Sequence, residues 1–87
     1  MDKVICVMRK GNNLVVGYTA LSELSERQDP ERAKGFSVNG GIEMAVSMAV
    51  DWLKKEGVVP SRVRDYIDDR GGIVEEKYKE MLMEGFR

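Results

Sequence analysis

The sequence predicts a small α+β domain in which an antiparallel β-hairpin, of two or three strands, packs against a long central helix and two shorter C-terminal helices. Three observations predict this class. Two apolar runs near the N-terminus are separated by a segment containing glycine and asparagine, residues 42–56 have the strongest helical periodicity, and two shorter amphipathic segments follow. With 87 residues, the chain is expected to be a single domain spanning 1–87.

The hairpin is predicted from residues 4–8 and 14–18, which are rich in β-branched side chains. Gly11 and Asn12 lie between them and tolerate the positive φ that tight hairpin turns need. Neither run alternates between apolar and polar residues, which predicts that both faces of the strands are covered. Either helices flank the sheet on both sides, or a second copy or a partner protein covers one face.

The segment after the hairpin is mostly polar over residues 20–34, and we expect a surface excursion that is partly helical. Asp29 and Pro30 are typical of an N-cap and a first helical residue. Residues 35–38 then alternate, with Phe36 and Val38 pointing the same way, and predict a short third strand.

The long helix is predicted over residues 42–56, where apolar side chains recur at the i, i+3, i+4, i+7 spacing of a buried face. Gly57 is typical of the position just after a helix end. Residues 62–70, with Val63 and Tyr66 inward, and residues 74–83 are predicted to form the two shorter helices.

Several classes of chemistry are disfavoured. The chain has no histidine and one cysteine, Cys6, inside an apolar run, so histidine-activated nucleophiles and the usual zinc ligand sets are excluded. We predict no catalytic residue, no metal and no cofactor, and therefore not an enzyme. An acidic group between residues 65 and 76 has oxygen ligands for a divalent cation, but neighbouring arginines favour a self-paired surface. Its members are Asp65, Asp68, Asp69, Glu75 and Glu76.

The amino-acid composition limits the classes of binding partner that we expect. The chain has 14 basic and 15 acidic residues, well mixed along its length, and therefore has no basic arm to attract nucleic acid or an anionic membrane. No apolar run approaches transmembrane length. We expect a cytoplasmic protein with no membrane partner and no evident small-molecule substrate.

The favoured function is a small protein-interaction or self-associating module, a homodimer or an accessory or inhibitor protein that binds a larger partner. This follows from strands that are apolar on both faces and from methionines in excess of what one small core hides, since Met also builds adaptable binding surfaces. The candidate interface residues are Val7, Val15, Tyr18, Met44, Met48 and Met81.

The alternative function is a nucleic-acid-binding regulator that uses residues 49–70. Gly57 and Val58 followed by Val63 and Tyr66 resemble the turn and second helix of a helix-turn-helix. The resemblance implies that the second helix opens with the nucleic-acid contacts. These would be Ser61, Arg62 and Arg64.

Overall fold

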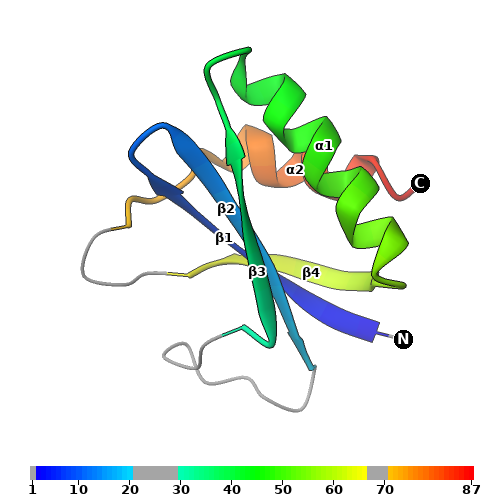
Figure 1. The fold of residues 1–87 in the computed structure, drawn as a ribbon. Coiled ribbons are helices and arrows are strands. Elements are labelled where there is room, and N and C mark those ends of the chain that lie inside the picture. Colours follow the sequence, from blue (N-terminus) through cyan, green and yellow to red (C-terminus); the bar gives the residue numbers. More distant parts are fainter. Residues whose placement is uncertain (1, 21–29, 67–70) are drawn as a thin grey trace.

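The computed structural model describes residues 2–20, 30–66 and 71–87. Four strands and two helices follow one another along these residues, and the ribbon in Figure 1 shows both helices on the same side of the sheet. The elements are β1 (Asp2–Lys10), β2 (Asn13–Ala20), β3 (Arg32–Ser37), α1 (Ile42–Lys55), β4 (Val59–Asp65) and α2 (Glu76–Glu84).

The sheet is mixed, with the strand order β3-β2-β1-β4. The β1–β2 hairpin turns at Gly11, whose φ of 59° lies in the left-handed region that glycine adopts freely. β2 pairs antiparallel with both β1 and β3, whereas β4 pairs parallel with β1 after the crossover through α1. The β1–β4 register shifts between Lys3 and Val4, which leaves Ser61 as an extra residue on β4.

The core lies between the sheet and the helices. Alternate residues of β1 and β2 point toward the helices, and α1 presents its apolar stripe to them. The chain then leaves α1 through Gly57, which has a φ of 75°. The buried members of the cluster are Ile5, Val7, Leu14, Val16, Tyr18, Phe36, Ala45, Val46, Ala49, Val50, Leu53, Val58, Val74 and Leu82.

The face of the sheet away from the helices is also buried along β1. Val4, Cys6 and Met8 alternate with the core residues and therefore point to this second face, yet they are at most 5% exposed. Arg64 of β4 is in register with Cys6 and is itself buried. The continuous apolar run of β1 thus predicted its burial on both faces.

The predicted arrangement of elements is wrong, although the class is α+β. Over the described residues, the structure has a four-stranded mixed sheet and two helices rather than a hairpin with three helices. A helix was predicted over residues 62–70, but residues 59–65 form the strand β4. Arg62 and Arg64 point to one face and Val63 to the other, so these residues fit the two-residue period of a strand as well as the period of a helix. The strand forms because these residues pair with the edge of β1 that β2 leaves open.

Most of the other predicted elements are present, with some changes in their bounds. The hairpin and the long helix are confirmed, and the last helix is confirmed as α2. The third strand begins earlier than expected, at Arg32, because residues 32–34 pair with β2 despite their polar character. Residues 21–29 and 67–70 lie outside the described residues, and so does most of the predicted polar excursion.

Candidate functional site

The two edges of the sheet, β3 and β4, differ in what lies along them. Edge strands turn the N–H and C=O of every second residue away from the sheet. On β3, Val38 N–H donates to Asn12 C=O at 2.9 Å. Because the direction of the backbone groups alternates along a strand, the N–H and C=O of Lys34 and Phe36 also face β2. The backbone groups of Ala33, Gly35 and Ser37 therefore face outward. On β4, Tyr66 N–H donates to Val7 C=O at 2.8 Å, which leaves Val63 and Asp65 outward.

None of the described residues obstructs the β3 edge. Ala33, Gly35 and Ser37 are exposed, and their small side chains point to the face away from the helices. A Cβ built on Gly35 would meet no described atom outside its immediate neighbours closer than 3.6 Å. No described residue pairs with the outer side of this strand. Another extended chain can therefore lie against it without displacing a side chain.

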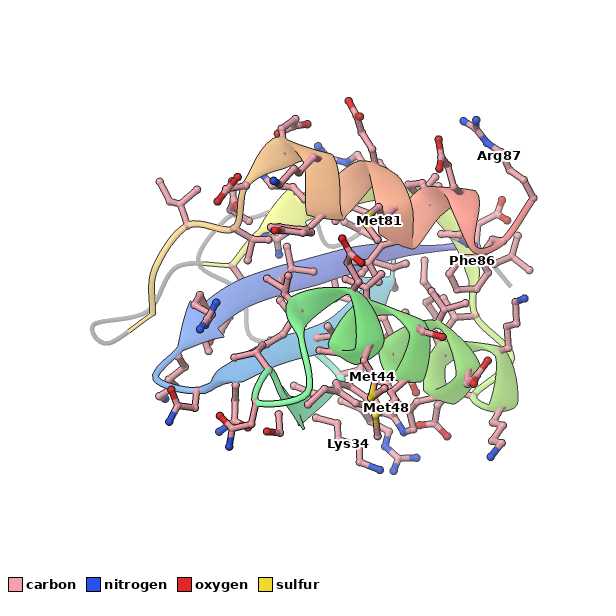
Figure 2. All side chains as sticks on the ribbon, turned by 90° about the horizontal axis from the view of Figure 1, so that it is seen from above. Lys34, Met44, Met48, Met81, Phe86 and Arg87 are labelled. Carbon is pink, nitrogen blue, oxygen red and sulfur yellow. The ribbon has the colours of Figure 1, made fainter. Side chains whose placement is uncertain are left out.

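Helix α1 adds an apolar margin to this edge. Met44 and Met48 are 58% and 51% exposed, and they follow each other by one helical turn. Figure 2 shows them on the side of α1 that faces away from α2, beside Lys34 of β3. Exposed apolar groups that gather beside an open strand are typical of interaction sites. We call Ala33, Gly35 and Ser37 with Met44 and Met48 the β3 edge site.

Aromatic and polar contacts hold β3 and the C-terminal end of α1 together next to the exposed methionines. The Trp52 ring lies 6.0 Å from the rings of both Tyr18 and Phe36. The Tyr18 hydroxyl donates to Glu56 Oε1 at 3.2 Å, and Arg32 Nη1 is 2.6 Å from the same oxygen. Burial raises the pKa of Tyr18, and the Glu56 carboxylate raises it further. These contacts join the start of β3 to the end of α1, so the β3 edge site has a rigid support.

The β4 edge is protected. Pro60 has no N–H, Ser61 forms the bulge, and Arg62 is an exposed charge; all three features discourage strand pairing. Between β4 and α2 lies an open groove of about 430 Å³. Its lining is mixed in charge and comprises Ser61, Arg62, Val63, Glu76, Lys79, Glu80, Met83, Glu84 and Arg87.

An ion pair fastens α2 along this groove. Lys79 Nζ donates to Asp65 Oδ2 at 2.7 Å and lies 3.2 Å from Glu76 Oε2. The Lys79 side chain is only 11% exposed. The hydrogen bond to Asp65 raises the pKa of Lys79, against the opposing effect of burial. The buried cation of the groove is therefore already engaged inside the protein.

Cys6 lies on the far face of the sheet and is 2% exposed. Burial raises the pKa of its thiol, and the charges of Arg64 and Arg62 with a hydrogen bond from Arg64 oppose this only in part. A buried thiol with a raised pKa is a poor nucleophile at neutral pH.

The predicted interface residues do not gather in one place. Val7 and Tyr18 are buried in the core. Val15 is half-buried on the far face, and Met81 lies between the helices beside a groove of about 350 Å³. Only Met44 and Met48 share an exposed surface (Figure 2). Sequence reasoning missed Ala33 and Gly35, whose only signal was two small residues alternating with Lys34 and Phe36.

The helix-turn-helix interpretation is wrong because its second helix is the strand β4. Ser61 and Arg62 are exposed on that strand, whereas Arg64 is buried. Of the acidic group, Asp68 and Asp69 lie outside the described residues. Among the residues that the structure does describe, no three His, Cys, Asp or Glu side chains are grouped so that they could hold a metal ion.

Comparison of the chain with protein-family models, with curated proteins and with solved structures finds no match in any of the three. Neither α1 nor α2, the helices in the described part of the chain, has the length and apolar character needed to cross a membrane.

Proposed function

We propose that this protein is a small, non-catalytic interaction module, and that it binds an extended polypeptide segment by β-strand addition at the β3 edge site. The single observation behind this proposal is the outward backbone of Ala33, Gly35 and Ser37, exposed beside Met44 and Met48. In strand addition, main-chain hydrogen bonds supply affinity, and alternate side chains of the added strand supply specificity.

The two faces of the added strand would meet different surroundings. Side chains on the helix side would contact Met44, Met48 and Lys34, which favours apolar groups with an acidic group at one position. Side chains on the other side would lie beside Ala33 and Gly35, and a Cβ at Gly35 meets only ordinary contacts with Asn13. We therefore expect a preference for segments with apolar residues at every second position.

The ionisable groups described above support a binding role over catalysis. Lys79 joins α2 to β4 through Asp65, Tyr18 joins β3 to α1 through Glu56, and Cys6 is buried. The first two groups hold elements together, and the third is a free thiol buried in the sheet. Nucleic-acid binding through Ser61, Arg62 and Arg64 is not proposed, because these residues lie on a strand with one of them buried.

Selection of peptides tests the proposal without knowledge of the natural partner. A library of random extended peptides would be selected on the immobilised protein and the binders titrated against variants. Gly35→Lys places a long charged side chain beside the added strand and is expected to weaken binding at least tenfold. Ile73→Lys, which adds the same charge at a 69% exposed position outside the β3 edge site, is the matched control and should leave affinity unchanged.

Either of two results would contradict this function. One is a set of peptides whose affinity is indifferent to Gly35→Lys and falls with substitutions in the β4–α2 groove. The other is the absence of any β3-dependent binding, whether of selected peptides or of the protein to itself.

A further inference from the structure

The β3 edge has the symmetry needed to pair with a second copy of itself. A two-fold axis brings the same surface of both copies together, so that one strand runs antiparallel to its own equivalent. Residues opposite one another in an antiparallel pair have side chains on the same face of the sheet. The axis must therefore pass through one residue, which then lies opposite its own equivalent in the second copy. The candidates near the centre of β3 are Ala33, Lys34 and Gly35.

Charge selects among these registers. With Lys34 on the axis, the two Lys34 ammonium groups face each other; with Ala33 on the axis, Arg32 faces Lys34 of the second copy. Like charges opposite one another destabilise a strand pair. With Gly35 on the axis, Lys34 faces Phe36 of the second copy and no like charges are opposed. Lys34 already lies 5.7 Å from the Phe36 ring of its own chain, so this pairing repeats a favourable neighbour.

The Gly35 register also pairs the most backbone. Ala33 then faces Ser37, and Gly35 faces Gly35, so all three outward residues meet outward residues of the second copy. Moving the axis toward Ser37 shortens the paired segment, because β3 ends there. On the far face, the residues nearest the axis have side chains no larger than a methyl or hydroxymethyl group, so the two backbones approach without a clash.

The helices are compatible with this pairing. A two-fold axis through Gly35 and perpendicular to the sheet would place both α1 helices on the same face of the joined sheet. In each copy, α1 contacts β3, and Met44 and Met48 lie on the side of α1 away from α2, near Lys34 (Figure 2). Joining the two sheets would therefore bring the exposed methionines of both copies together and remove them from water. Flexible thioether side chains adapt well to such a contact.

The same operation fails at β4. An axis at Arg62 or Arg64 opposes identical guanidinium groups, and an axis at Val63 opposes Arg62 to Arg64. Pro60 and the bulge at Ser61 shorten the pairing further. Axes at residues 62 to 64 of β4 therefore all oppose like charges, whereas the axis at Gly35 of β3 does not.

We infer that a second copy of this chain occupies the β3 edge site, in antiparallel β3–β3 pairing with Gly35 on the two-fold axis, and that the dimer has one continuous eight-stranded sheet. This inference rests on the proposed function and adds the identity of the added strand, its direction and its register.

Cysteine cross-linking tests the register directly. Single cysteines would be placed at Gly35, Lys34 and Arg62 in a Cys6→Ala chain, and in the natural chain as well, since Cys6 is buried. Directly opposed residues have Cα atoms about 5.5 Å apart, within the range of a disulfide. In the inferred register the two Lys34 positions are offset along the strands by two residues, about 6.6 Å, and are out of reach.

The expected result is a solution mass near twice the monomer's 9.8 kDa and a rapid disulfide dimer for Gly35→Cys alone. Faster cross-linking of Lys34→Cys would overturn the register, and cross-linking of Arg62→Cys would overturn the choice of edge. A monomeric protein that forms no cross-link would overturn the second copy as occupant. In that case, peptides that bind in a β3-dependent manner would still support the proposed function, so the two failures are distinguishable.

Discussion

The two edge strands, β3 and β4, expose similar lengths of backbone but differ in nearly every feature that governs strand pairing. β3 has small side chains on one face, two exposed methionines beside the other, and no proline. β4 has Pro60, a bulge at Ser61 and the exposed charge of Arg62, and it is flanked by the acidic side of α2. An unpaired edge is thus not by itself a binding site, and its neighbours decide whether a further strand can be added.

The comparison also separates two uses of charge. Around β4, charged side chains form internal pairs such as Lys79 with Asp65 or remain exposed as protection against pairing. Around β3, the pair of Arg32 with Glu56 supports the strand from the helix face and leaves the outer edge open.

Lys79→Met should break the attachment of α2 beside β4. The substitution leaves the partly buried Asp65 carboxylate without its ammonium partner, and we expect the free energy of unfolding to fall by about 3 kcal/mol. Chemical denaturation measures the loss. Lys77→Met is the matched control, since Lys77 is 64% exposed, and it should leave the free energy of unfolding nearly unchanged. Equal effects of the two variants would show that the buried pair does not hold the helix.

Gly17→Ala should disturb the attachment of β3. A Cβ at Gly17 would lie 2.6 Å from the Arg32 carbonyl oxygen and 2.9 Å from Pro30 Cβ, so the start of β3 must shift. We expect a loss of about 2 kcal/mol in thermal or chemical unfolding. Gly35→Ala, whose new Cβ meets only ordinary contacts, is the control and should change stability by about 0.5 kcal/mol or less. A tolerated Gly17→Ala would mean that the two strands are less closely packed there.

High pH should weaken the contacts that attach both edge strands, β3 and β4, to the helices. The pKa values of Tyr18 and Lys79 are raised above their ordinary 10.0 and 10.5. Folding therefore favours their protonated forms, and the resulting stability is fully present below these values and lost as pH rises through the folded pKa of each group. Unfolding free energies measured from pH 8 to 12 should fall above about pH 10. Tyr18→Phe should remove the β3 part of the decline, and an unchanged pH profile would contradict that assignment.

Met44→Gln combined with Met48→Gln should separate binding from stability. Both side chains are more than half exposed, so the free energy of unfolding should change by less than about 0.5 kcal/mol. Association at β3 should weaken about tenfold, because the apolar margin is lost. Titration by light scattering or against a selected peptide measures this change. A stability loss without a change in association would instead make these methionines part of the core.

Sequence patterns predicted the local elements well and the sheet edges poorly. The hairpin followed from two apolar runs and Gly11, and α1 followed from a periodicity sustained over four turns. β4 was missed because its alternation is short and its partner, β1, is more than fifty residues away along the chain. No local preference of Arg62 or Val63 shows that a parallel neighbour is present.

The β3 edge site was missed for a related reason. Ala33 and Gly35 have no functional group, and their importance depends on β3 being last in the strand order, which is a property of the whole sheet. Met44 and Met48 were found because an excess of methionine is visible in the sequence. Val7 and Tyr18 were included although both are buried, because apolar character alone does not distinguish a buried strand residue from an exposed one.

The most direct test of the central claim is amide hydrogen exchange, measured in dilute and in concentrated protein. Pairing at β3 predicts that the outward N–H groups of Ala33, Gly35 and Ser37 exchange more slowly as concentration rises, while those of Val63 and Asp65 do not change. Slowing at Val63 and Asp65 instead, or no slowing at either edge, would contradict self-association through β3.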